Sequence, residues 1–526
     1  MTTSHPVLRA GLAALCATAI VLPLAGAAPA ATGTTARPGA RGPARPATEG
    51  KEILRERTVP LDPADYRWLC GTRPFGAPRE HVFDLFPDLR LRIVEDRLDH
   101  DGDSLTWTGH VRGEPSSNAV LSATGVCADT PDPASVGIDA HFDLGERVYR
   151  ISMPRNEPGR LRITEEDPDQ RKHPTGDDAD QENPLPDPAV MRQGLERLRQ
   201  RAAAGTDGPV VIDMIVGYTP AAAWRVGGDQ AVQSRIRLAE SYLNQAFADS
   251  NVQASVDVIG TYDTGYRGDQ TAALMKEKLE NPNDRDLGAR AAQLRRQYGV
   301  DLVSVINDVP DGSSGNASLP MPISERSDDQ AFSVVDVQSI VNWYNFGHEV
   351  GHNLGLWHDR ATLDVQAGGQ DYRPYLTTPY STGYITPDRR FHTLMAYATA
   401  CGQPCTAVNQ YSNTENTVDG QPLGDRYNDN AAVARLTTPI VAGYRTLAVA
   451  RQRYALTLTA GPGGTLRPST YGPYAPGTTV TLTARPADGY RVAGWESDGV
   501  SYSYTGTEAT VTMDRAHTVK VLFARR

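Results

Sequence analysis

The chain has 526 residues, which is too long for one domain, so we expect three to four domains. Its 63 Asp and Glu residues exceed its 52 Lys and Arg residues, and no basic block alternates with aromatic residues. This charge balance argues against nucleic acids and anionic membranes as partners. We interpret the mild acidity as a source of solubility.

The first 30 residues have the layout of a secretory signal peptide. Arg9 precedes a run of small and branched apolar residues, and Ala-x-Ala sites end at Ala27 and Ala30. A membrane anchor is the alternative, but the run is short for a span, contains Pro23 and lacks a basic stop. We therefore predict a secreted, extracellular protein with no transmembrane segment after the signal is removed.

The cysteines predict two disulfide bonds. Removal of the signal takes Cys16 away and leaves Cys70, Cys127, Cys401 and Cys405. An even number of cysteines in an exported chain indicates paired sulfurs. Cys401 with Cys405 would close a short loop, which leaves Cys70 with Cys127, although the sequence alone allows three pairings.

The region before about residue 205 is predicted to be mainly β. Residues 31–50 are mostly Ala, Pro, Gly, Thr and Arg, which is typical of a disordered linker. Short β-like runs separated by Gly, Pro and Asp turns recur between about 51 and 165, so we expect an all-β unit there. A charged, proline-rich linker is expected at 165–187, followed by a helix at 188–204.

Strands and helices alternate between about 206 and 447. The near-continuous apolar run at 210–218 predicts a buried strand, and apolar residues at helical spacing predict a helix at 229–250. Further strands are expected at 254–262, 301–308 and 332–337, and further helices at 286–299 and about 428–444. This alternation predicts an α/β (α+β) domain with a mixed, mostly parallel sheet. Residues 453–526 instead alternate Thr, Val and Tyr with polar residues, so we expect a separate small all-β module.

Three histidines lie close together in "FGHEVGHNLGLWHD", residues 346–359. On a helix, His348 and His352 project from one face, and Glu349 between them is placed to act as a general base. Gly355 can end the helix and return His358 to the same ion. Three neutral imidazoles with one open position are typical of a catalytic zinc site, whereas structural zinc sites usually include cysteine. The alternative is a set of unrelated histidines at a helix end.

The pattern HExxHxxGxxHD resembles the signature of the metzincin zinc proteases. Asp359 after the third histidine is similar to the reprolysin or adamalysin-like branch, and Met395 in "FHTLMAYA" lies where the family has its methionine turn. Tyr397 matches a tyrosine that ligates zinc in other branches, so its role as a ligand or as a pocket wall stays open. "GNASLP" at 315–320 lies where metzincins have the edge strand that pairs with an extended substrate, and a loop is the alternative.

The resemblance implies a zinc metalloendopeptidase with one catalytic Zn²⁺ held by the three histidines. Peptide bonds would be hydrolysed by a zinc-activated water with Glu349 as general base. Protein or peptide substrates are implied, and structural calcium stays open. The alternative is a catalytically idle, zinc-stabilised surface adhesin, and a third hypothesis is a zinc hydrolase of non-peptide amides.

The flanking regions also resemble parts of known proteins. Residues 51–205 resemble a reprolysin-type propeptide, which implies a zymogen cleaved near 199–208, and Cys70 is then an alternative thiolate ligand of zinc. Residues 453–526 resemble the divergent InlB-type bacterial repeat, in which Trp495 and Phe523 would be core residues. Contact with a cell surface or carbohydrate through this module is left open.

Overall fold

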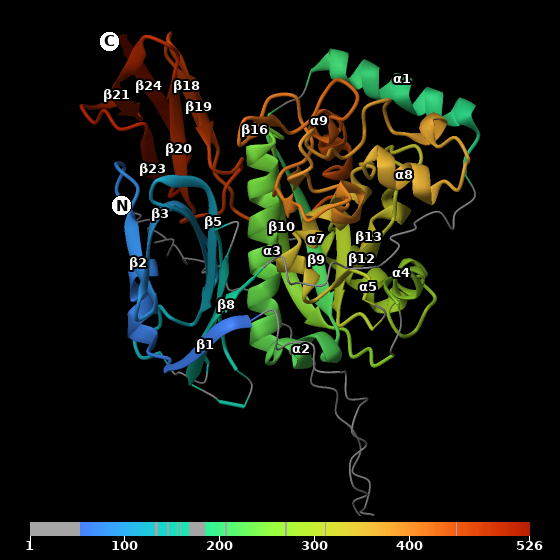
Figure 1. Ribbon diagram of the computed structural model, residues 1–526, viewed down its shortest axis with the longest axis horizontal. Helices are drawn as coiled ribbons and strands as arrows, with labels where there is room; N and C mark the ends of the chain where they lie inside the picture. The colour runs from blue at the N-terminus through green and yellow to red at the C-terminus, as the bar shows by residue number, and fades with distance from the viewer. Residues whose placement is uncertain are drawn as a thin grey trace, which may run out of the picture.

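The computed structural model describes residues 53–526 except 132–134, 145–146, 155, 158, 168–184, 206–207, 269–270, 311 and 449. The predicted signal, the linker at 31–50 and most of the linker at 165–187 lie outside the described residues. Figure 1 shows the N-terminal strands on one side of helix α3, the central α/β region on the other, and the C-terminal strands beside the N-terminal ones.

The N-terminal region is an antiparallel sheet in which sequence neighbours pair from β2 to β8 and β1 closes onto β8. Its strands are β1 (Ile53–Pro60), β2 (Glu80–Phe86), β3 (Leu89–Asp101), β4 (Ser104–Val111), β5 (Glu114–Thr124), β6 (Gly137–Asp143), β7 (Val148–Ser152) and β8 (Arg160–Glu166). Trp107 and Phe142 are fully buried in its core. The expected all-β unit also contains a 3-10 helix, η1 (Pro63–Leu69), because Asp62 accepts from the Ala64 backbone N–H and Pro63 favours the first turn.

The central sheet has the order β10-β9-β11-β13-β12. Its strands are β9 (Val210–Tyr218), β10 (Ala254–Asp263), β11 (Leu302–Asn307), β12 (Gly315–Ala317) and β13 (Phe332–Asp336). β10, β9, β11 and β13 pair in parallel, and β12 pairs antiparallel to β13 at the edge. The segment 315–320, for which the sequence allowed an edge strand or a loop, therefore begins with an edge strand.

Helices cover both faces of this sheet. The helices of this region are α1 (Pro188–Ala204), α2 (Pro220–Val226), α3 (Asp229–Asp249), α4 (Ala272–Glu280), α5 (Gly288–Tyr298), α6 (Ser339–Asn342), α7 (Asn345–Asn353), α8 (Arg360–Gln366) and α9 (Asn430–Val441). Short elements follow α8: η4 (Arg373–Tyr375), β14 (Phe391–His392), η5 (Ala398–Cys401), β15 (Thr406–Ala407), β16 (Thr417–Val418) and β17 (Gln421–Pro422), while η3 (Asp328–Gln330) precedes β13. Val216 and Val335 face the core that contains α3 and α7, whereas their neighbours Ile215 and Val334 face the core of α4 and α5.

The C-terminal strands pack around an apolar core of their own, and one of them also pairs with the N-terminal sheet. These strands are β18 (Leu456–Ala460), β19 (Gly464–Pro468), β20 (Thr479–Pro486), β21 (Tyr490–Ser497), β22 (Val500–Tyr502), β23 (Glu508–Thr512) and β24 (His517–Arg525). β18, β24, β21 and β22 form one sheet, whereas β20 pairs with β3 and so adds β19, β20 and β23 to the N-terminal sheet. Trp495 is fully buried, and Phe523 packs against the same core.

The cysteines form two disulfides, Cys70–Cys127 and Cys401–Cys405. The sulfur of Cys70 is thus bonded to Cys127, which excludes the alternative of a free Cys70 thiolate. Among the described residues, none of the helices is long and apolar enough to cross a membrane.

Candidate metal centre

Helix α7 carries His348, Glu349 and His352, and all three side chains are buried. Tyr344 precedes the helix with φ of 55°. Gly351 faces Met395, because a Cβ at Gly351 would lie 2.5 Å from the Met395 sulfur. A larger residue at this position would push the helix away from the segment beneath it.

Gly355 reverses the chain after α7. Its φ is 78°, a left-handed conformation that favours glycine. The Gly355 N–H donates to the His352 carbonyl at 2.8 Å, and the Thr377 hydroxyl donates to the Gly355 carbonyl at 2.5 Å. The chain then returns and presents His358 to the two helical histidines.

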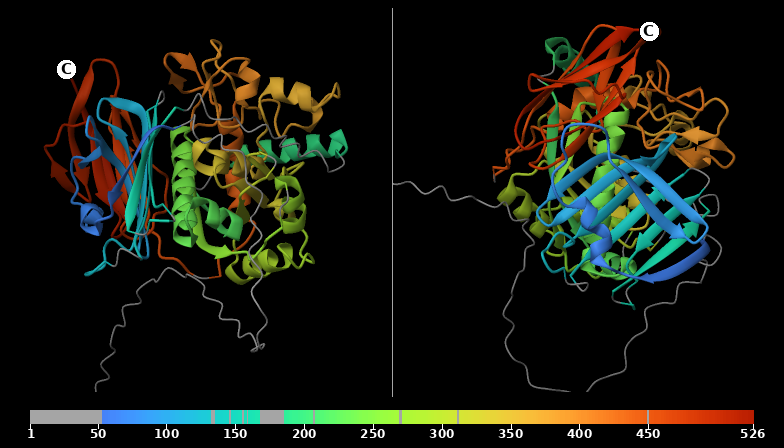
Figure 2. Two further views of the ribbon diagram at one scale, coloured as in Figure 1. Left: turned by 60° about the horizontal axis from the view of Figure 1, so that its bottom comes forward. Right: turned by 90° about the vertical axis from the view of Figure 1, so that its left-hand side faces the viewer.

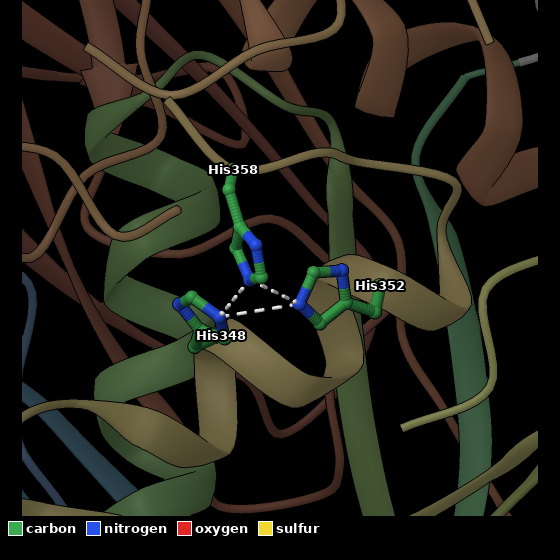
Figure 3. A group of neighbouring side chains, drawn as sticks. All are labelled: His348, His352 and His358. Carbon is green, nitrogen blue, oxygen red and sulfur yellow. Dashed lines mark hydrogen bonds between the residues drawn. The ribbon is translucent and has the colours of Figure 1, made fainter. Parts of the chain in front are cut away.

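The three imidazoles converge through their Nε2 atoms (Figure 3). The Nε2 atoms lie 3.2 Å apart for His348 and His352, 3.2 Å for His348 and His358, and 3.0 Å for His352 and His358. Nitrogens bound to one tetrahedral zinc at the usual bond length are about 3.3 Å apart. The group can therefore hold one metal ion.

The opposite ring nitrogens explain why these Nε2 atoms suit a cation. Each Nδ1 faces an oxygen acceptor: the Leu394 carbonyl at 2.7 Å, the Leu356 carbonyl at 2.9 Å and Gln366 Oε1 at 2.9 Å. A neutral ring that donates from Nδ1 has an unprotonated Nε2, so three lone pairs point at one another. Without a cation between them these lone pairs repel, and a bound metal removes that repulsion.

Burial keeps the three rings neutral. It lowers the pKa of His348 to about 3 and that of His358 to about 4, and it lowers the pKa of His352 well below its usual value. Metal ligation requires neutral imidazole, so these environments favour binding near pH 7.

Glu349 lies between α7 and the edge strand β12. Its side chain is fully buried, and a Cβ at Gly315 would lie 2.5 Å from Glu349 Oε1. Because Gly315 has no side chain, β12 leaves space for the Glu349 carboxylate. β12 pairs with β13 at the edge of the sheet. A carboxylate held in this way has little freedom to move, which suits a positioned base.

Met395 and its neighbours support α7 from below. Met395 is fully buried beneath Gly351, and the preceding Leu394 supplies the carbonyl that fixes the His348 ring. The Tyr411 hydroxyl donates to the Gly347 carbonyl at 2.8 Å. Met395 thus sets how closely α7 approaches this segment, and Leu394 sets the orientation of its first histidine.

Asp359 joins the two segments that surround His358. Its carboxylate accepts from the Thr362 N–H at 3.0 Å and the Thr362 hydroxyl at 2.6 Å, which caps α8. It also accepts from the Tyr397 N–H at 3.0 Å. The Tyr397 ring centroid lies 4.6 Å from that of His358 and 5.9 Å from that of His348. These distances place Tyr397 against the histidines and leave its role as a ligand open.

Several residues that the sequence did not single out help to build this centre. Gln366, the last residue of α8, orients His358. Asn353 donates to the carbonyls of Ser318 at 2.9 Å and Phe332 at 3.1 Å, and so ties the end of α7 to the strands β12 and β13. The Asn353 contacts have no sequence motif, because they join residues 35 and 21 positions apart, and the Gln366 contact depends on how α8 packs against His358.

The chain is similar to known metallopeptidases. Residues 209–412 match metallo-peptidase family M12, and residues 454–526 match the divergent InlB B-repeat domain. A peptidyl-Asp metalloendopeptidase of Xanthomonas campestris pv. campestris is 28% identical over 249 residues, which are 46% of this chain and 54% of that protein. A protein of the same name from Stenotrophomonas maltophilia is 26% identical over 369 residues, which are 68% of this chain and 81% of that protein.

A solved structure titled "Structure of a chaperone-substrate complex" aligns with 21% identity and a TM-score of 0.35 over 46% of this chain and 36% of that one. A score this low carries no inference about function or fold. The match to the Xanthomonas protein spans about half of that protein.

Proposed function

Residues 209–412 form a metallopeptidase domain of family M12, and on this premise we propose that the protein is a secreted zinc-dependent endopeptidase made as a zymogen. The observation that carries the proposal is the convergence of three Nε2 atoms within 3.0–3.2 Å of one another, with the buried Glu349 on the same helix. An adhesin that used zinc only for stability would have no need of a buried carboxylate at this position.

The residues of the chain have distinct roles in the proposed reaction. His348, His352 and His358 hold zinc, which when bound supplies the Lewis-acid chemistry that polarises a peptide carbonyl and activates water. Glu349 accepts a proton from the attacking water and donates it to the leaving amine. β12 is the last strand of the central sheet, and an extended peptide would bind by pairing with it.

The test is hydrolysis of denatured casein by the exported protein, with and without a zinc chelator, and after zinc is restored. We expect the chelator to abolish hydrolysis, zinc to restore it, and Glu349→Ala to lack it. A wild-type protein that binds one zinc per chain and cleaves neither casein nor a broad peptide library would contradict the proposal and favour the adhesin.

The names of the relatives supply a substrate preference to test. We extend the proposal to peptide bonds next to aspartate, which is what "peptidyl-Asp" in those names suggests. A matched pair of peptides that differ only by Asp and Asn tests it. We expect a higher kcat/KM for the Asp peptide, and equal values would remove this preference while leaving the endopeptidase proposal intact.

Secretion, zymogen processing and surface contact are further parts of the proposal. The signal-like N-terminus and the position of the β-rich region before the catalytic domain support the first two. Cleavage is proposed near 199–208, and α1 ends within this region at Ala204. N-terminal sequencing of the exported protein tests this placement.

The InlB-type match supports contact with a cell surface through residues 454–526.

A further inference from the structure

The N-terminal sheet and the C-terminal module share backbone hydrogen bonding. β3 and β20 pair antiparallel, with Val480 opposite Arg97. The Thr481 hydroxyl also donates to the Glu95 carbonyl at 3.0 Å. Figure 1 shows the strands of the C-terminal region next to the N-terminal strands, and β20 is the strand that pairs with β3. We call residues 53–167 the N-terminal β-domain and residues 454–526 the C-terminal module.

A second contact lies on β23, the edge strand of the module. The backbone N–H of Thr510 donates to the Gly76 carbonyl at 2.7 Å, and the Thr512 hydroxyl donates to the Arg73 carbonyl at 2.9 Å. Gly76 of the N-terminal β-domain therefore forms an isolated antiparallel bridge with Thr510 of β23, and Arg73 is held beside the same strand by the Thr512 hydroxyl. This is the geometry by which sheet edges bind extended peptides.

Phe75, within this segment, packs into the apolar core of the module. Its ring centroid lies 4.6 Å from that of Tyr502 and 6.4 Å from that of Trp495. Trp495 is fully buried, and Phe75 is among the side chains packed against its core. One backbone bond thus aligns the segment with β23, and one partly buried aromatic side chain packs against the core of the module.

The segment is held rigidly on its own domain. The Arg73 guanidinium binds the Glu95 carboxylate through Nε at 2.8 Å and Nη2 at 3.0 Å, and both side chains are buried. The Cys70–Cys127 disulfide fixes the chain three residues earlier. A segment ordered before binding loses little conformational freedom when it docks.

The opposite face of the N-terminal β-domain contacts the catalytic domain. Its strands β5 and β6 pack against α3, an arrangement that both views in Figure 2 show. The Tyr344 hydroxyl donates to Asp143 Oδ2 at 2.9 Å, and Tyr344 directly precedes the histidine-bearing helix α7. The domain thus lies between the module and the start of that helix.

From these contacts we propose that the C-terminal module is an intramolecular receptor for the segment Arg73–Gly76, and that it retains the N-terminal β-domain on the catalytic domain after the chain is cut. The working enzyme is then a two-piece, non-covalent complex, in which Asp143 continues to support Tyr344. The inference takes the cut itself, near 199–208, from the proposed function. Its test measures binding and needs no activity, so the two can fail separately.

The experiment uses the full chain with Glu349→Ala, which prevents self-cleavage. A recognition sequence for a site-specific protease is inserted between Gly205 and Gly208, the protein is cut, and release of the N-terminal piece, which carries the N-terminal β-domain and α1, is followed by size-exclusion chromatography over time. We expect the two pieces to elute together. We expect Phe75→Ala to release the domain at least about 10-fold faster, because the aromatic contacts are lost, and Phe75→Leu to restore part of the retention.

Val82→Ala is the matched control, because Val82 is a 43% exposed hydrophobic residue on β2 of the same domain. Thermal unfolding before cleavage shows whether each variant is folded. The inference is overturned if the cut wild-type pieces separate on the column, or if folded Phe75→Ala releases the domain no faster than Val82→Ala.

Discussion

Gly315→Ala tests how tightly the edge strand positions Glu349. The added Cβ would lie 2.5 Å from Glu349 Oε1, whereas ordinary contact begins at 3.4 Å, so the carboxylate must move by about 0.9 Å (3.4 − 2.5). Misplacement of a catalytic group by about 1 Å costs on the order of 10²-fold in rate. We therefore expect kcat/KM to fall about 100-fold, or about 2.7 kcal/mol.

The assay is kcat/KM on a quenched fluorescent peptide, measured beside the zinc content and the melting temperature. Gly260→Ala is the matched control, because Gly260 lies in β10 of the same sheet and an added Cβ there meets nothing within 4 Å. We expect the control to keep its activity and both variants to keep zinc. The reasoning is refuted if kcat/KM of folded, zinc-loaded Gly315→Ala stays within twofold of the control.

Three further predictions concern stability. Asp359→Ala removes the cap of α8 and the bond to Tyr397, so denaturant unfolding is expected to show a loss of about 1–2 kcal/mol, and an unchanged midpoint would contradict the capping role. Gly351→Ala places a Cβ 2.5 Å from the Met395 sulfur and 3.2 Å from the Tyr411 ring, so we expect a loss of about 1–3 kcal/mol by the same measurement, and unchanged stability would contradict close packing at this position. Burial lowers the pKa of His81, which stacks on Trp68, to about 4. The unfolded chain then binds the proton more tightly, so stability is fully present above pH 6.5 and falls as the pH decreases toward about 4. His81→Phe should reduce this dependence in melts between pH 4 and 7, and an identical pH profile would contradict the assignment.

The local features of the candidate site could be predicted from the sequence because their determinants lie close together. His348 and His352 follow from helical spacing, and Gly355 supplies the left-handed turn that returns His358. The long helix α3 followed in the same way from its apolar periodicity, since Val232 and Phe247 are both fully buried on the side facing the core.

The parts that could not be predicted depend on contacts between distant segments. The position of Gly315 against Glu349 and the bonds from Asn353 to the Ser318 and Phe332 carbonyls exist only after β12 and β13 have packed against α7. The pairing of β3 with β20 joins residues more than 380 apart, for example Val480 with Arg97. Alternation of polar and apolar residues predicts strands, but it does not say which edges will pair.

The most direct test of the central claim measures zinc content and peptide hydrolysis together in the wild type and in Glu349→Gln. Glutamine keeps the shape of the side chain but cannot accept the proton from water. We predict one zinc per chain in both proteins and hydrolysis by the wild type alone. Hydrolysis by zinc-loaded Glu349→Gln at the wild-type rate, or by wild-type protein from which zinc has been removed, would contradict the account.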